Sequence, residues 1–229
     1  MESLTTPPPR IKICCIASVD EARLAIRYGA SAIGLVSAMP SGPGPIDEEL
    51  IAEIVRHVPP GVATFLLTCA TDSISIINQQ RRTRANTIQL VDSVAPSVYP
   101  DLRAALPGIK LVQVIHVRDD DSVDEAIVAS QHVDALLLDS GNPSLPIKEL
   151  GGTGRIHDWD ISRRIRESVA VPLFLAGGLN ATNVAEATRR VQPFGIDVCS
   201  GVRTAGNLDE SKLRDFMTAV ARAEPLTGL

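Results

Sequence analysis

The amino-acid sequence predicts a single (β/α)8 barrel, the TIM-barrel fold of the α/β class. Eight short apolar runs alternate with segments of helical periodicity, and no linker or shift in composition divides the chain. Strands that alternate with helices imply a parallel sheet with right-handed crossovers. An open, doubly wound sheet has the same local pattern, but eight strands in 229 residues favour closure into one barrel.

The expected strands are short and aliphatic, as strands buried on both faces of a parallel sheet usually are. Hydrophobic residues make up 45% of the chain and aromatic residues only 3%, so the core must consist mainly of Val, Ile, Leu and Ala. The strands are expected at Ile11–Ile16, Ala32–Val36, Val62–Leu67, Thr87–Leu90, Lys110–Ile115, Ala135–Leu138, Pro172–Ala176 and Ile196–Cys199.

Helices are expected in the intervals between these strands. Ser18 and Glu21 form a capping box that predicts the start of the first helix. Residues 50–58 carry apolar side chains at the spacing of one helix face. Asn180 is the expected N-cap of the seventh helix, and the last helix should run from about Asp209 to Arg222.

The barrel is expected to span residues 11–222, between a flexible lead-in at 1–10 and a C-terminal tail at 223–229. The lead-in is rich in Pro and Thr and has no apolar centre, so it does not resemble a secretory signal. The chain has no apolar run of about 18 residues, and its net charge of −5 provides no attraction for nucleic acid or anionic membranes. We therefore expect a cytoplasmic protein that binds neither nucleic acid nor membrane, and both a monomer and a homodimer stay open.

The cysteines and histidines are not spaced as metal ligands. The chain contains four of each, without a CxxC motif. The cysteines, at positions 14, 15, 69 and 199, are expected to be reduced thiols in the cytoplasm rather than a disulfide scaffold. We expect no metal and no other cofactor.

Three glycine clusters follow strands, at 151–154, 176–179 and 200–201. In such barrels the active site lies at the carboxyl ends of the strands, and the loops after strands seven and eight often bind phosphate. Glycine lets backbone N–H groups approach an anion closely. One cluster could merely turn the chain, but three on one rim predict a phosphate site. Its expected residues are Gly152, Thr153, Gly154, Gly177, Gly178, Ser200 and Gly201.

Cys14 and Asp139 are the candidate acid–base pair. A cysteine at the end of the first strand can face the barrel mouth, although a buried cysteine is more often an inert small hydrophobe. A carboxylate directly after three leucines is costly to bury unless it is paired or reactive, and an N-cap role is the alternative. Asp197, inside the last strand, could either fix the rim or face a ligand. The long segment 140–158 is expected to be a functional loop.

Four ordered motifs carry a resemblance to a known family. They are Lys12-Ile13-Cys14, Gly151-Gly152-Thr153-Gly154, Leu175-Ala176-Gly177-Gly178-Leu179-Asn180 and Asp197-Val198-Cys199-Ser200-Gly201-Val202. The sequence resembles the phosphoribosylanthranilate isomerases, barrel enzymes of tryptophan biosynthesis. The resemblance implies an Amadori rearrangement that converts N-(5′-phosphoribosyl)anthranilate to 1-(2-carboxyphenylamino)-1-deoxyribulose 5-phosphate. Such an enzyme is an intramolecular oxidoreductase.

The resemblance also implies roles for individual residues. Cys14 would be the general base, Asp139 the general acid, and the glycine loops would hold the 5′-phosphate. Asp197, Gln89 and Arg203 would bind other parts of the substrate. Neither a metal nor a nucleotide would be needed.

The sequence departs from the family pattern where the aglycone would bind. The glycine expected after the base is Cys15, and the glutamate expected after the Ser-Gly-Val motif is Arg203. No Arg or Lys stands between Arg27 and Arg56, where the family has an arginine for the anthranilate carboxylate. Arg203 could compensate for it. The alternatives are a paralogue that isomerises another phosphoribosyl amine or sugar phosphate, and a non-catalytic phosphosugar-binding barrel.

Overall fold

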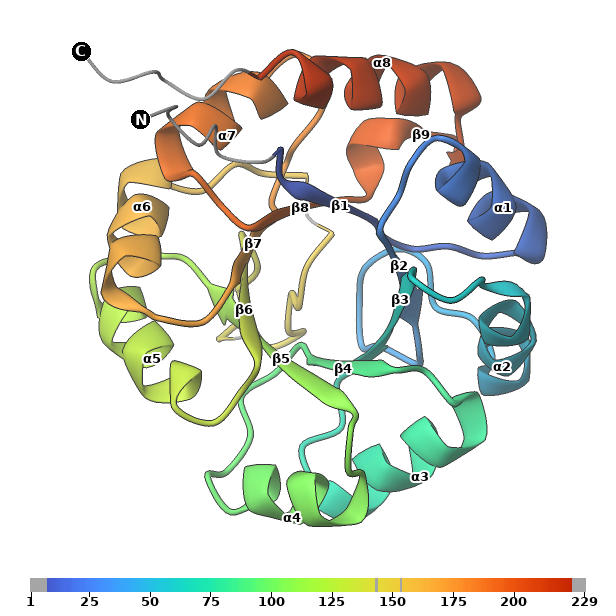
Figure 1. Cartoon of the computed structure of the whole chain (residues 1–229). Coiled ribbons are helices and arrows are strands. Elements are labelled where there is room, and N and C mark those ends of the chain that lie inside the picture. The colour runs from blue at the N-terminus through green and yellow to red at the C-terminus, as the bar shows by residue number, and fades with distance from the viewer. Residues whose placement is uncertain (1–7, 143, 153, 224–229) are drawn as a thin grey trace, which may run out of the picture.

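The protein forms a closed barrel of eight parallel strands surrounded by helices (Figure 1). The computed structural model describes residues 8–142, 144–152 and 154–223. The strands follow one another around the barrel in chain order, and β1 pairs with both β2 and β8 to close the sheet. The predicted (β/α)8 barrel is confirmed, and residues 1–7 and 224–229 of the expected terminal segments lie outside the described residues.

The observed strands agree with the predicted runs to within one to three residues at each end. They are β1 (Arg10–Ile13), β2 (Ala32–Val36), β3 (Ala63–Thr68), β4 (Thr87–Leu90), β5 (Lys110–His116), β6 (Ala135–Asp139), β7 (Leu173–Leu175) and β8 (Gly195–Val198). The short strands β9 (Arg203–Thr204) and β10 (Asn207–Leu208) form a separate hairpin after the 3-10 turn η1 (Ser200–Val202). The barrel is thus complete without them.

Eight α-helices follow the strands among the described residues. They are α1 (Val19–Arg27), α2 (Glu48–His57), α3 (Ser73–Thr83), α4 (Val98–Ala105), α5 (Asp121–Ser130), α6 (Trp159–Ser168), α7 (Val184–Val191) and α8 (Glu210–Ala221). None of the helices in this part of the chain is both long and apolar enough to cross a membrane.

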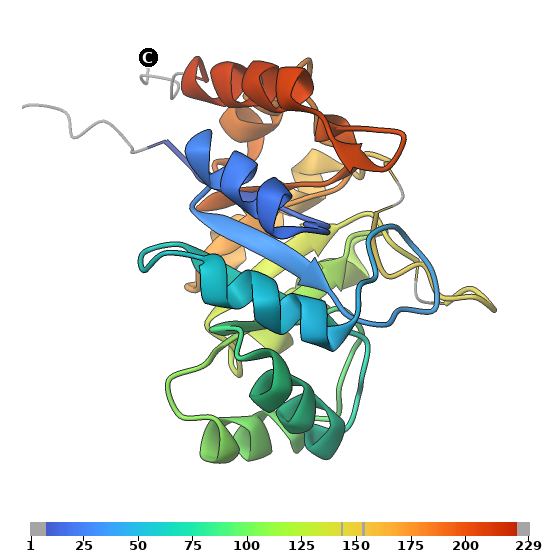
Figure 2. The same cartoon turned by 90° about the vertical axis from the view of Figure 1, so that its right-hand side faces the viewer.

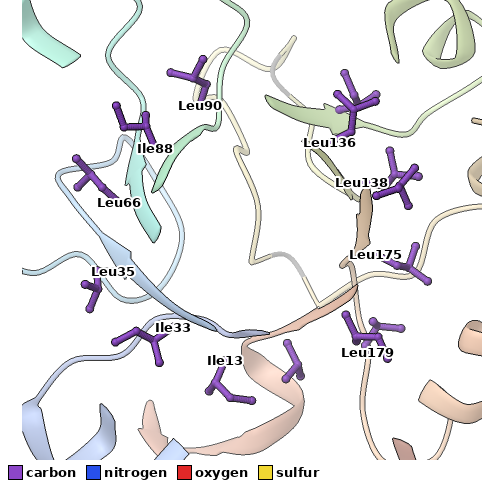
Figure 3. Packing of buried hydrophobic residues seen from close by; sticks show 14 of the residues in the cluster. Ile13, Ile33, Leu35, Leu66, Ile88, Leu90, Leu136, Leu138, Leu175 and Leu179 are labelled. Carbon is purple, nitrogen blue, oxygen red and sulfur yellow. The ribbon is translucent and has the colours of Figure 1, made fainter. Parts of the chain in front are cut away.

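Side chains along each strand alternate between two buried clusters. One lies between the sheet and the helices, and Figure 3 shows its aliphatic side chains, among them Ile13, Ile88 and Leu138, on the outer side of the strands. The other fills the inside of the barrel and includes Cys14 and Phe174. Because neighbouring residues of a strand point to opposite faces, an outward Ile13 directs Cys14 inward.

The helix starts test two sequence predictions. Ser18 caps α1 by accepting a hydrogen bond from the Glu21 amide at 3.1 Å, so the predicted helix start is confirmed. The Glu21 carboxylate accepts its return bond from the amide of Ala17, one residue before the N-cap. The predicted N-cap at Asn180 is wrong, because α7 begins three residues later with Asn183 as its N-cap. The side-chain oxygen of Asn180 instead accepts hydrogen bonds from the amide and the hydroxyl of Thr182, in the turn before α7.

The loops after β2 and β6 extend from the same side of the barrel, as Figure 2 shows. The Ser41 hydroxyl of the first loop donates a hydrogen bond to the Lys148 carbonyl of the second. Gly152 lies so close to Pro43 that a Cβ at this glycine would stand 2.4 Å from the proline ring. The two loops therefore contact each other over the end of the barrel that should hold the site.

Candidate active site

A cavity opens at the carboxyl ends of the strands. The structure brings most of the predicted site residues to it from different strands, and they are Cys14, Gln89, Asp139, Gly152, Gly154, Gly177, Gly178, Asp197 and Ser200. Apolar side chains of Met39, Leu67, Val91 and Leu150 line the cavity as well. Thr153, also predicted, lies outside the described residues.

Cys14 follows β1 and points into the barrel. Its side chain is buried, and its amide donates a hydrogen bond to the Val198 carbonyl at 2.8 Å. Gly34 on the neighbouring strand makes the space for it, since a Cβ at this position would stand 2.7 Å from the Cys14 sulfur. The same point is 3.1 Å from the Lys12 ammonium. The thiol therefore lies next to a positive charge at the cavity floor.

Lys12 is buried completely and forms an ion pair with Asp197. Its Nζ lies 2.8 Å from Asp197 Oδ2 and 5.2 Å from the centre of the Phe65 ring. Burial alone would lower the pKa of Lys12, but the neighbouring Asp197 and Cys14 raise it above its usual value, so the ammonium stays charged. The sequence places Lys12 in a motif but predicts no role for it. A lysine in an otherwise apolar strand was the available signal.

One carboxylate oxygen of Asp197 is available to a ligand. While Oδ2 contacts Lys12, the buried Oδ1 has no hydrogen-bond partner among the described residues. Gln89 has the same feature, because its side-chain oxygen Oε1 is buried and unpartnered there. Both residues line the cavity. An unpaired buried acceptor is costly, so two of them mark places where a ligand could donate hydrogen bonds.

Asp139 ends β6 at the edge of the cavity. Its Oδ1 accepts a hydrogen bond from the Ser140 amide at 2.7 Å, and Oδ2 faces Gly151, where a Cβ would approach it to 2.6 Å. Burial raises the pKa of this carboxyl, although the Ser140 amide and the charges of His116 and Lys12 oppose the shift. A carboxyl with a raised pKa retains its proton to higher pH. This is the property of a general acid.

The three glycine clusters converge beside this pair. A Cβ at Gly154 would stand 3.7 Å from the Ser200 hydroxyl, which joins the loops after β6 and β8. Gly178 has a φ of +64°, and a Cβ there would come within 2.9 Å of the Gly154 carbonyl oxygen. Only glycine suits both this backbone conformation and this contact. The loops after β6, β7 and β8 thus form one cradle with exposed backbone.

Two predicted residues take other positions. At Gly201 a Cβ would stand 2.0 Å from the Leu179 carbonyl oxygen, so this glycine permits close packing of two loops and is not part of the cavity lining. Arg203 also lies outside the lining. Its guanidinium donates hydrogen bonds to both carboxylate oxygens of Glu21 and to the carbonyls of Cys14 and Cys15. The structure therefore gives Arg203 the role of holding the backbone beside the cavity.

Comparison with known proteins agrees with this geometry. Residues 11–219 match the family model for N-(5′-phosphoribosyl)anthranilate (PRA) isomerase. The curated N-(5′-phosphoribosyl)anthranilate isomerase of Methanosarcina acetivorans is 34% identical over 224 residues, which cover 92% of each chain. Isomerase 2 of Methanosarcina mazei is 36% identical over 210 residues, covering 91% of this chain and 92% of the relative. The chain belongs to the phosphoribosylanthranilate isomerase family.

Solved structures of the family have the same fold. The phosphoribosyl anthranilate isomerase of Thermotoga maritima superposes with a TM-score of 0.78 at 27% identity, covering 93% of this chain and 98% of that one. The enzyme of Thermococcus kodakaraensis gives a TM-score of 0.78 at 29% identity, with 93% and 99% covered. This chain is thus a family member in sequence and in architecture.

This isomerase-family member has a cysteine where the resemblance led us to expect a glycine. Cys15 has a φ of +61°, a conformation that costs a side chain about 1–2 kcal/mol. Its buried sulfur lies 2.7 Å from the Cys199 sulfur. The neighbouring Gly44 allows the close approach, since a Cβ there would stand 2.6 Å from Cys15 Cβ. Cys15 thus has a backbone conformation that favours glycine, although it carries a side chain.

Proposed function

We propose that the protein is a phosphoribosylanthranilate isomerase of tryptophan biosynthesis. It would convert N-(5′-phosphoribosyl)anthranilate to 1-(2-carboxyphenylamino)-1-deoxyribulose 5-phosphate, as the names of its relatives indicate for them. The observation that carries this proposal is that Cys14 and Asp139 line one cavity with the glycine cradle, in a chain of this family.

In this proposal Asp139 is the general acid. Its raised pKa favours the protonated carboxyl, which would protonate the ring oxygen of the phosphoribosyl group as the C1′–O bond breaks. Ring opening leaves a Schiff base between C1′ and the aromatic nitrogen. The Schiff base then acidifies the proton on C2′.

Cys14 would take that C2′ proton as the general base. Only the thiolate can do so, and the Lys12 ammonium lies beside this sulfur. The resulting enol-amine tautomerises to the ketone at C2′ and the amine at C1′. One carbon of the substrate is oxidised and its neighbour is reduced, so the reaction is an intramolecular oxidoreduction that requires neither metal nor cofactor.

The remaining cavity residues would hold the substrate. The cradle around Gly154, Gly178 and Ser200 would bind the 5′-phosphate through backbone N–H groups. Asp197 Oδ1 and Gln89 Oε1 would accept hydrogen bonds from substrate hydroxyl or amine groups, since both atoms are buried without a partner. Lys12 is a positioning residue, because it fixes Asp197 through the other carboxylate oxygen.

The second candidate function is isomerisation of a different phosphoribosyl amine. No Arg or Lys of the described residues lines the cavity, and Arg203 is committed to Glu21 and to backbone carbonyls. The apolar walls suit an aromatic ring, but no described cation in the lining meets its carboxylate. A charge-assisted hydrogen bond to a carboxylate contributes about 1.5–3 kcal/mol. Because the cavity lacks such a bond, the KM of this protein for phosphoribosylanthranilate is expected to be raised.

A fluorescence assay with freshly prepared phosphoribosylanthranilate tests the proposal directly. The wild-type protein should consume the substrate, and Cys14→Ser and Asp139→Asn should each lower kcat by about 100-fold to 10,000-fold. Complementation of a tryptophan auxotroph that lacks the isomerase separates the two candidate substrates. If the wild-type protein and both variants bind phosphosugars but turn over neither substrate, the protein is a non-catalytic binder instead.

The cellular setting is part of the same proposal. All four cysteines are free thiols, which suits the reducing cytoplasm. A monomer and a homodimer are both compatible with the fold, and gel filtration with light scattering distinguishes them.

A further inference from the structure

Two thiols meet in the cavity beside the proposed base. Cys15 follows β1 and Cys199 follows β8, and the pairing of these strands ends at Ile13 with Val198, so the two segments leave the sheet side by side. The Cys15 and Cys199 sulfurs share a hydrogen bond at 2.7 Å. Both residues line the cavity. A disulfide holds its sulfurs about 2.05 Å apart, so bond formation needs less than about 1 Å of movement.

We propose that Cys15 and Cys199 are a reversible disulfide site that lowers the activity of the protein when it is oxidised. The bond would join the segment that carries Cys14 to the segment that carries Ser200 of the phosphate cradle. It would therefore fix the base and the cradle relative to each other. The loss of activity rests on the proposed function, whereas formation of the disulfide does not.

The surroundings favour Cys199 as the attacking thiol and Cys15 as the resolving thiol. The hydrogen bond with Cys15 and the charge of Arg203 lower the pKa of Cys199 despite its burial. Hydrogen bonds with Cys14 and Cys199, together with burial, raise the pKa of Cys15. Cys199 is also the more exposed of the pair. It therefore carries the negative charge first and can be reached from the cavity.

The oxidant in this scheme is a low-molecular-weight disulfide such as oxidised glutathione. The Cys199 thiolate attacks one of its sulfurs, which forms a mixed disulfide and releases a glutathione thiolate. Cys15 then loses its proton and attacks the Cys199 sulfur, which releases the second glutathione. Two protein thiols lose two electrons in total, and one glutathione disulfide becomes two thiols.

Mass spectrometry of the oxidised full-length protein tests the pairing. After treatment with oxidised glutathione, the wild-type mass should fall by two hydrogen atoms, and digestion should yield a peptide pair linked through Cys15 and Cys199. Cys14→Ser and Cys69→Ser should still form the bond, whereas Cys15→Gly and Cys199→Ser should not. Glycine suits the positive φ at position 15, so this variant retains the backbone. A linkage through Cys14 or Cys69, or no linkage, would overturn the proposal.

Activity measured on the same samples tests the consequence. Oxidised wild-type protein should lose at least about tenfold in kcat/KM, because small displacements of catalytic groups are costly, and dithiothreitol should restore it. A disulfide that leaves kcat/KM unchanged would overturn the proposed loss of activity. If the reduced protein isomerises no substrate, the proposed function fails, and the linked peptide alone then decides the disulfide.

Discussion

Lys12 and Asp197 form a buried ion pair beside the cavity, in which Asp197 Oδ1 has no partner among the described residues. The positions of Cys14 and Asp139 at one cavity could be predicted because barrel topology brings all strand ends to one rim, whereas their expected roles rest on the family resemblance. The functions of Lys12 and Arg203 could not, since they depend on where a long side chain ends. Arg203 turns away from the cavity to Glu21, and Lys12 turns inward to Asp197.

Lys12→Met should separate stability from catalysis. The change leaves Asp197 buried without its partner, which should cost about 3–5 kcal/mol in the free energy of unfolding. The double variant Lys12→Met with Asp197→Asn removes both charges and should regain most of that stability, while kcat stays low. Urea denaturation and steady-state kinetics measure the two quantities. Recovery of kcat in the double variant would contradict a positioning role for Lys12.

Asp139→Asn should make the folded protein more stable at neutral pH. Burial raises the pKa of Asp139 in the folded state. The contribution of the protonated carboxyl to stability is therefore complete below the pKa that Asp139 has in the unfolded state. It is lost as the pH rises through the pKa of Asp139 in the folded state. Asparagine is neutral at every pH and can keep the bond from the Ser140 amide. Denaturation from pH 3 to pH 8 should show a gain at high pH that disappears in acid, together with loss of activity.

At the scale of elements, α1 is tied to the loop after β8 through Glu21. Its carboxylate caps the start of the helix, binds Arg203, and accepts a hydrogen bond from the Leu208 amide at 2.8 Å. Sequence patterns identified the capping box, because that motif is local. They placed the N-cap of α7 at Asn180 instead of Asn183. Asparagine is a favoured N-cap residue at either position, and only the conformation of the turn before α7 distinguishes the two.

Glu21→Gln should destabilise the protein far more than a matched change on the same helix. It leaves the buried Arg203 guanidinium without a counter-charge, which should cost about 2–4 kcal/mol. Asp20→Asn is the control, because its contact with Arg23 is exposed and contributes at most about 0.5 kcal/mol. Thermal and urea unfolding compare the two variants. Equal effects would show that the link from α1 to Arg203 is not a stabilising contact.

For the molecule as a whole, the closed sheet explains why distant sequence segments form one site. The glycine cradle combines loops after β6, β7 and β8, and the cavity floor joins β1 to β8. The fold and the convergence of the glycine loops followed from periodicity and length. The aglycone end could not be predicted, because it depends on loops whose contacts, such as Ser41 with Lys148, have no local signal.

Ligand binding at this rim should stabilise the entire barrel. A ligand that binds only the folded state at about 100 times its Kd adds about 2.7 kcal/mol, which for a chain of this size raises the melting temperature by about 5–10 °C. Ribose 5-phosphate is the probe, and ribose at equal concentration and ionic strength is the control. The phosphate-bearing sugar alone should produce the shift, because the cradle of Gly154, Gly178 and Ser200 offers its backbone to an anion.

Gly178→Ala, which places a Cβ 2.8 Å from the Arg155 carbonyl, should remove most of the shift. An undiminished shift in this variant, or an equal shift with ribose, would place the phosphate elsewhere on the molecule.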